Sequence, residues 1–326
     1  MIEIFDEISR RCRAGERVAL CTVVDARGST PQSHGARMLV TAAGELMGTL
    51  GGGCVEAEVK QRALRRLLAS EPSDDHFSGP AGDAMSFRLD HDHGWDDGMW
   101  CGGILDVHVQ ILVGETMAQQ FARVAASLRA GEPTRVEIPA ANFSEMLEPA
   151  PPLYIAGGGH VAQALAKLAT ELGFEVTVID DRPDVVTPAR FPNAARIAGD
   201  VDIGLSNLPI TPHTYVVIVT RGHHRDAAAL AAVIDKPAKY IGMIGSKRKV
   251  RTILGHLAEQ GISRDKLAAV RAPIGLEIGA ISVPEIAVSI AAELIAVRRG
   301  QANATGQPMK LSHQELDNWL DRDRLG

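Results

Sequence analysis

The sequence has few aromatic residues, few cysteines and no excess of basic charge. Aromatic side chains make up 4% of the 326 residues and hydrophobic residues 45%, so aliphatic side chains must fill the cores. Such cores are typical of α/β proteins with buried parallel strands. The formal net charge is −6, which lacks the basic footprint of a nucleic-acid-binding protein. The composition therefore favours an α/β fold and argues against nucleic acid as a partner.

Targeting and membrane signals are also missing. The chain begins Met1-Ile-Glu-Ile-Phe-Asp, without the basic start and apolar core of a signal peptide. No run approaches the roughly 20 apolar residues that a membrane-spanning helix needs. We therefore expect a cytoplasmic protein with no membrane partner. No C-x-x-C spacing occurs among the four cysteines, and a reducing cytosol disfavours disulfides, so Cys12 and Cys21 are interpreted as small buried hydrophobic residues.

A proline-rich stretch divides the chain. Residues 139–152 contain four prolines and little periodicity, which is typical of an interdomain linker. The length is sufficient for two domains, because single domains commonly have about 100–200 residues. We predict a mixed α/β domain over residues 1–138, a Rossmann-like domain over 153–300 and a polar tail over 301–326.

The second domain begins with a glycine-rich turn. Gly157, Gly159 and Ala162 fit the G-x-G-x-x-[G/A] spacing of a dinucleotide-binding turn between a strand and a helix. The next expected strand, 174–179, leads to Asp180, where this fold places an acid for the ribose hydroxyls. The order strand, turn, helix, strand and acid predicts a doubly wound parallel sheet.

Polar residues follow two later strands of this domain. Arg221 and His223 come after the expected strand 214–220, and Ser246 and Lys247 begin a helix after a strand that ends in glycine. Open α/β sheets bind ligands at the carboxyl ends of their strands. A basic helix start suits a phosphate, although an ordinary solvated face explains the charges equally well.

The first domain has a glycine turn of its own. Gly51, Gly52 and Gly53 precede Cys54 at the start of a helical pattern, where backbone N–H groups bind anions and lower the pKa of a thiol. Cys101 is likewise followed by two glycines, so the pair indicates a soft-ligand or reactive site. A tightly packed turn would explain the glycines equally well. The acidic, histidine-containing stretch 90–97 is more typical of a solvated turn than of a metal site.

Seven short sequence blocks, which follow one another in order along the chain, contain most of these glycines and polar residues. They are Gly28-Ser-Thr-Pro-Gln32, Gly48-Thr-Leu-Gly-Gly-Gly-Cys-Val-Glu56, Cys101-Gly-Gly103, Ile155-Ala-Gly-Gly-Gly-His-Val161, Thr220-Arg-Gly-His223, Ile241-Gly-Met-Ile-Gly-Ser246 and Pro273-Ile-Gly-Leu-Glu-Ile-Gly-Ala280. Together they resemble the XdhC/CoxI family, accessory proteins for molybdenum hydroxylases such as xanthine dehydrogenase. One departure is the pair His223-His224 before Arg225-Asp226, where a Gly-His-Asp sequence is expected.

The resemblance implies a noncatalytic role. The protein would bind molybdenum cofactor as cargo, protect it while a cysteine desulfurase installs the sulfido ligand, and deliver it to the hydroxylase. A homodimer is expected, because dimers are the commonest oligomers. We expect Cys54 and Cys101 to contact molybdenum. The predicted cofactor-binding residues are Gly51, Gly52, Gly53, Cys54, Cys101, Gly157, Gly158, Gly159, His160, Asp180, Arg221, His223, Ser246 and Lys247.

Two other functions compete with this one. An NAD(P)-dependent oxidoreductase could use the same glycine turn, because a fold does not determine a function. The chain has no Tyr-x-x-x-Lys pair and no histidine beside an acid in a persuasive proton-transfer setting, which favours the chaperone. A thiol-based redox or metal-sensing protein would rest on Cys54 and Cys101 alone.

Overall fold

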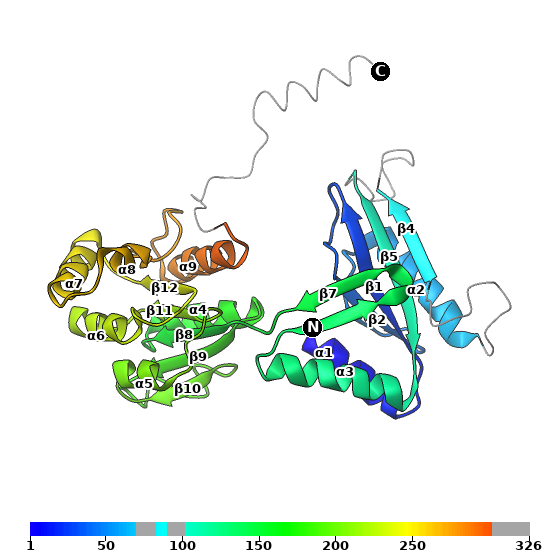
Figure 1. Ribbon diagram of the computed structural model, residues 1–326, viewed down its shortest axis with the longest axis horizontal. Coiled ribbons are helices and arrows are strands. Elements are labelled where there is room, and N and C mark those ends of the chain that lie inside the picture. The colour runs from blue at the N-terminus through cyan, green and yellow to red at the C-terminus, as the bar shows by residue number, and fades with distance from the viewer. Residues whose placement is uncertain (70–82, 90–101, 302–326) are drawn as a thin grey trace, which may run out of the picture. The chain divides into compact units, whose positions relative to one another are not determined.

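The computed structural model describes residues 1–69, 83–89 and 102–301, and the chain divides into two compact units (Figure 1). The first unit is Met1–Pro149 and the second is Ala150–Gly326. Each unit contains its own five-stranded sheet. The predicted tail lies almost wholly outside the described residues.

The first unit is built on an antiparallel sheet with strand order β3-β2-β1-β5-β4. Its strands are β1 (Val18–Arg27), β2 (Arg37–Thr41), β3 (Leu46–Gly48), β4 (Asp83–Arg88), β5 (Ile104–Leu112), β6 (Thr134–Ile138) and β7 (Phe143–Leu147). The helices are α1 (Ile2–Arg13), α2 (Gly53–Leu68) and α3 (Gly114–Arg129), with a short 3₁₀ helix η2 (Pro139–Ala141). Strands β6 and β7 form a separate hairpin.

Strand β1 is buried on both faces, because successive side chains point to opposite sides of a strand. Val18 and Leu20 pack in the cluster that contains α1 and α3, whereas Ala19 and Cys21 pack in the cluster that contains α2. The sheet therefore lies between two helical layers. Cys12 on α1 is also buried, which confirms the interpretation of Cys12 and Cys21 as core residues.

The predicted linker differs from the structure. Strand β7 lies inside residues 139–152 and pairs along its length with β6, so this stretch belongs mainly to the first unit. Phe143 and Leu147 are buried and attach the strand to the first unit. The four prolines flank β7 rather than interrupt it, and Pro152 begins the next strand, a position that needs no ladder N–H. Proline content alone therefore overestimated the length of the linker.

The second unit is a doubly wound parallel sheet, as predicted. Its strand order is β10-β9-β8-β11-β12, and the pairs are parallel. The strands are β8 (Pro152–Ala156), β9 (Glu175–Asp180), β10 (Ala195–Ala198), β11 (Tyr215–Ile218) and β12 (Tyr240–Met243). The helices are α4 (His160–Glu171), α5 (Val201–Asn207), α6 (His223–Val233), α7 (Lys247–Glu259), α8 (Arg264–Ala269) and α9 (Val283–Arg298).

Helices cover both faces of this sheet (Figure 1). Side chains of α4 and α9 form one core with the strands, and side chains of α5, α6, α7 and α8 form the other. Helix α9 begins with a capping box between Ser282 and Glu285 and packs against α4. Among the described residues, no helix combines the length and apolar character needed to cross a membrane.

Candidate functional site

Three glycine-containing blocks of the first unit lie together. A Cβ added to Gly51 would lie 2.6 Å from Cβ of Pro31, and one added to Gly103 would lie 2.3 Å from the carbonyl oxygen of Ser29. A Cβ on Gly28 would lie 3.2 Å from Cα of Gly103. The loop at residues 28–32 therefore packs against both the glycine turn before α2 and the glycines before β5.

The chain's own side chains occupy part of the turn before α2. Oε1 of Glu56 accepts hydrogen bonds from the N–H groups of Leu50 at 2.8 Å and Gly52 at 2.9 Å, and also contacts the hydroxyl of Thr49. The N–H of Gly51 donates to Oγ1 of Thr49 at 3.0 Å. Partial burial opposes ionisation of Glu56, but these hydrogen bonds outweigh it and lower its pKa. These three N–H groups are therefore committed to internal partners.

The other side of the turn is open. Cys54 is the second residue of α2 and is exposed. A Cβ on Gly52 or Gly53 would meet no atom within 4 Å, although both have positive φ angles, of 81° and 65°. Cys101 and the acidic stretch 90–97 lie outside the described residues. Among the residues that the structure describes, no group of three or more His, Cys, Asp or Glu side chains is placed to hold a metal ion.

The remaining described thiols have a different environment. Burial raises the pKa of Cys12 to about 11 and that of Cys21 to about 12. Both therefore stay protonated at neutral pH and lack the thiolate that reacts with electrophiles or binds metals. Of the three cysteines that the structure describes, Cys54 is the one whose side chain is exposed.

The glycine turn of the second unit lies at the switch point of the parallel sheet, where β9 follows on one side of β8 and β11 on the other. Gly157 has a φ of 112°, and a Cβ there would lie 2.6 Å from the carbonyl oxygen of Val219. Glycine is therefore required for the ends of β8 and β11 to approach. Gly159 is the N-cap of α4, where an added Cβ would meet nothing within 4 Å. His160 is the first residue of this helix, and its side chain is exposed.

Asp180 ends β9 as the spacing predicts, but its carboxylate faces the chain itself. Oδ2 accepts from the N–H of Gly158 at 2.7 Å and from Nη2 of Arg182 at 2.9 Å. Oδ1 accepts from Nε of Arg182 at 2.8 Å and from its backbone N–H at 3.1 Å. Burial opposes ionisation, but hydrogen bonds from Arg182 and Gly158 lower the pKa of Asp180 to about 2. The carboxylate is thus ionised and internally satisfied.

The segment after β11 combines exposed and buried polar residues. His223 and His224 are exposed, with ring centroids 3.9 Å apart. Arg221 and Arg225 both approach Asp181, at 3.9 and 2.5 Å. Asp226 lies two residues beyond His224, in the first turn of α6. Asp226 is fully buried there, and the residues that contact its carboxylate are Thr220 and Lys249.

The two predicted residues at the start of α7 differ in their contacts. Oγ of Ser246 accepts from the N–H of Lys249 at 3.3 Å and caps the helix. Lys247 is the first residue of α7 and is exposed. Ser246 therefore has a structural role in this arrangement, whereas Lys247 faces solvent.

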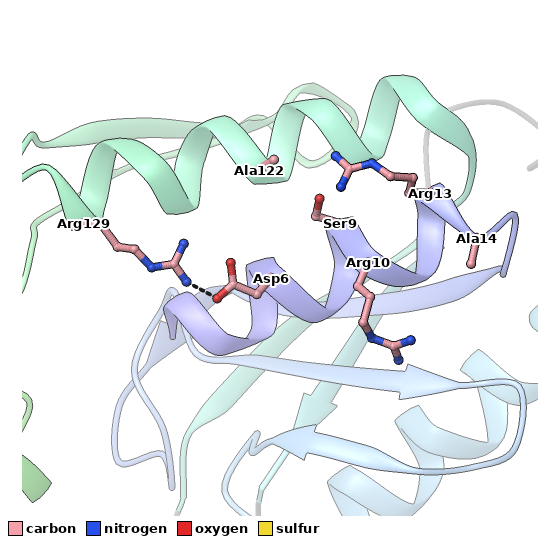
Figure 2. A pocket seen from close by; sticks show the side chains of 7 residues that line it. All are labelled: Asp6, Ser9, Arg10, Arg13, Ala14, Ala122 and Arg129. Carbon is pink, nitrogen blue, oxygen red and sulfur yellow. Dashed lines mark hydrogen bonds and ion pairs between the residues drawn. The ribbon is translucent and has the colours of Figure 1, made fainter. Parts of the chain in front are cut away.

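A separate groove between α1 and α3 contains none of the predicted site residues (Figure 2). It encloses about 510 Å³ and is lined by Asp6, Ser9, Arg10, Arg13, Ala14, Ala122 and Arg129. Each arginine has a carboxylate nearby: Arg129 pairs with Asp6, Arg10 with Glu7 at 2.7 Å, and Arg13 with Glu115 at 3.8 Å. This pairing makes the groove a poor anion site despite its arginines.

Family comparisons match both units. A model described as the XdhC Rossmann domain matches residues 153–294, and a model of the XdhC and CoxI family matches residues 11–78. The chain belongs to the XdhC and CoxI family. The matched ranges include both glycine turns and Cys54.

Three relatives match over most of this chain. The uncharacterized protein YqeB of Escherichia coli is 30% identical over 96% of this chain, but this chain spans only 49% of YqeB. A probable xanthine dehydrogenase subunit of Bacillus subtilis is 28% identical, over 87% of this chain and 94% of that protein. The molybdenum cofactor insertion chaperone PaoD of Escherichia coli is 26% identical, over 88% of this chain and 86% of that protein.

A solved structure has the same fold. A crystal structure described as a xanthine dehydrogenase from Bacillus halodurans matches with a TM-score of 0.76, covering 94% of this chain and 98% of that chain. The two sequences are 24% identical, so the likeness shows the fold alone.

Two arginines beside the glycine turn of this XdhC-family chain were missing from the sequence prediction. Arg182 holds Asp180, and Nη2 of Arg190 donates to the carbonyl oxygen of Gly158 at 3.1 Å. Arg182 follows Asp180 by two residues, a local signal that could have suggested the pair. Arg190 lies 32 residues from Gly158, so no local pattern indicates that contact.

Proposed function

We propose that this protein binds molybdenum cofactor, protects it during sulfuration and delivers it to a molybdenum hydroxylase such as xanthine dehydrogenase. The main support is the convergence of residues 28–32, Gly51 and Gly103 beside an exposed Cys54. Relatives named as a molybdenum cofactor insertion chaperone and a probable component of xanthine dehydrogenase support the same role.

The first unit would hold the metal end of the cofactor. Molybdenum is a soft, oxidisable centre, and thiolate sulfur is a soft ligand. The thiol of Cys54 lies at the N-terminus of α2 and is exposed, so a ligand can reach it. Cys101 precedes Gly102 and Gly103 directly in the chain, and we assign it the second thiol contact. Gly52 and Gly53 leave room for a bulky ligand beside Cys54.

The second unit offers candidate contacts for a phosphate group. The N-terminus of α4 follows Gly157, Gly158 and Gly159, and helix N-termini bind anions through backbone N–H groups and the helix dipole. His160, Arg221, His223 and Lys247 lie on segments that follow strands of the same sheet. In this role the residues bind, orient and shield the cargo, and they catalyse no reaction.

The proposal includes two partners. A cysteine desulfurase would supply the sulfido ligand while the cofactor is held, and the recipient hydroxylase would take the finished cofactor. We propose that the chain acts as a homodimer in the cytoplasm.

The experiment is anaerobic binding of molybdenum cofactor to the purified chain, followed by transfer to an apo-hydroxylase. Near-stoichiometric retention is expected, and Cys54→Ala should reduce the retained fraction at least about tenfold, as expected when a charged ligand contact is lost. Cys12→Ala is the matched control, because that thiol is buried in the α1 core and should leave retention unchanged. Substrate turnover with NADH and no retention of cofactor would instead identify an oxidoreductase.

A further inference from the structure

The carboxyl end of β9 is where a dinucleotide-binding fold recognises ribose hydroxyls. In this chain, Asp180 accepts four hydrogen bonds at that position, one from Gly158 and three from Arg182. An ionised carboxylate has about four lone-pair sites in total. A ribose diol would therefore have to displace a bond that the chain already makes. The side chain is also only 5% exposed, so it offers a ligand little surface.

Positive charge surrounds the same end of the sheet. Arg182 is 25% exposed even while it holds Asp180. Among the described residues, the side chain of Arg190 makes its hydrogen bonds to neutral oxygens, the carbonyl of Gly158 at 3.1 Å and Oε1 of Gln163 at 3.3 Å. The carboxylate of Asp181 is shared by Arg221 and Arg225. Even with the exposed Asp184 included, these four arginines outnumber the three aspartates.

We propose that the Rossmann-like unit binds a phosphate monoester in place of a ribose diol at the end of β9, with Arg182 and Asp180 as the specificity-determining pair. The carboxylate of Asp180 is already occupied, so it is not available as the acceptor that a diol needs. Arg182 offers a guanidinium, a group suited to binding a phosphate. Arg190 adds charge beside the glycine turn. If the ligand is the molybdenum cofactor of the proposed function, on which this part of the inference rests, the site favours a cofactor that ends in phosphate over one extended by a nucleotide.

The test uses two probes that differ at this position. NADP⁺ carries a phosphate where NAD⁺ carries a hydroxyl on the adenosine ribose, and both contain the same pyrophosphate. Calorimetry on the full chain at one fixed ionic strength should show NADP⁺ binding at least about tenfold more tightly. Equal affinities, tighter NAD⁺ binding or no binding of either probe would overturn the proposal.

A variant pair connects the preference to Arg182. Arg182→Ala removes the bonds from Nε and Nη2 but keeps the backbone N–H bond, so two lone-pair sites of Asp180 become available. The ratio of the two affinities should shift toward NAD⁺ by about tenfold. Arg264→Ala, at the exposed first residue of α8, makes the same charge change and should leave the ratio unaltered. An unaltered ratio in a folded Arg182→Ala variant would count against the assignment.

The wild-type comparison does not depend on whether any variant folds. It also separates this inference from the proposed function. A preference for NADP⁺ without retention of molybdenum cofactor would preserve the inference and reject the chaperone role. Retention of the cofactor without a preference for NADP⁺ would do the reverse.

Discussion

Each unit contains a three-glycine turn that leads into a helix, and the two turns are stabilised in different ways. In the first unit, Glu56 reaches back from α2 to the turn that contains Gly52. In the second, Asp180 reaches across from the neighbouring strand β9 to Gly158. Both turns therefore already contain a carboxylate of the chain, one local and one from a distant segment. Glycines before a helix thus do not by themselves make an empty anion site.

The turns also differ in what their first glycine approaches. Gly51 lies against the ring of Pro31, whereas Gly157 lies against the backbone at Val219. A proline ring at a surface loop can shift, but the backbone at the end of a central strand cannot move without disturbing the sheet. The second turn should therefore tolerate substitution less well than the first.

The largest expected effect comes from Gly157→Ala. The positive φ and the 2.6 Å approach to the Val219 oxygen should together reduce the free energy of unfolding by about 3 kcal/mol or more. Urea denaturation followed by tyrosine absorbance measures this unit, because Tyr154, Tyr215 and Tyr240 all lie within it. Gly159→Ala is the control, with a φ of −68° and open space, and should change stability far less. Equal effects of the two substitutions would contradict the close-approach argument.

An intermediate effect should appear in acid. The folded-state pKa of Asp180 is lowered from 3.8 to about 2, so the unfolded state binds more protons between these values. The contribution, about 2 kcal/mol, is complete above about pH 4 and is lost as the pH falls toward 2. Asp180→Asn should remove this part of the pH dependence in urea denaturation at a series of acidic pH values.

The control for this substitution is Asp235→Asn in the same unit. Asp235 forms an exposed ion pair with Lys266 at 2.6 Å, and exposed pairs contribute little to stability. The acid profile of this variant should follow the wild type. A profile of Asp180→Asn that also follows the wild type would show that the carboxylate is not held as the structure indicates.

The smallest effect should come from the turn of the first unit. Glu56→Gln keeps an acceptor oxygen but removes the charge, so the N–H groups of Leu50 and Gly52 lose charge-assisted bonds. Hydrogen exchange at these two amides should accelerate about fivefold, equivalent to about 1 kcal/mol. Glu58→Gln on the exposed side of α2 should not change their exchange. Unchanged exchange in Glu56→Gln would mean that Thr49 and the glycines hold the turn without the charge.

Much of the fold was predictable because it depends on local patterns. The continuous apolar run of β1 indicates a buried strand, and the helical stripe of α1 follows from side-chain periodicity. The spacing from Gly157 to Asp180 correctly placed the acid at the end of β9. The predicted linker was too long, because composition does not reveal that Phe143 and Leu147 are buried.

The candidate site was less predictable. Residue types indicated Cys54 and the glycines, but not that residues 28–32 pack on both glycine segments. Ser246 suited a phosphate contact by its position, whereas the structure uses its hydroxyl to cap α7. The partners of the buried Asp226 come from two different segments, so no local spacing indicated them.

The sequence by itself determined the family, the doubly wound sheet and the two glycine turns, because these depend on residue types at fixed spacings. Only the tertiary structure decided which polar groups are still available to a ligand. A hydrogen bond requires donor and acceptor within about 3 Å. For Asp180, Arg190 and the loop at residues 28–32, the partners meet only after strands and helices have packed. This is why the sequence predicts a ribose contact at Asp180, whereas the fold contains an internally satisfied carboxylate there.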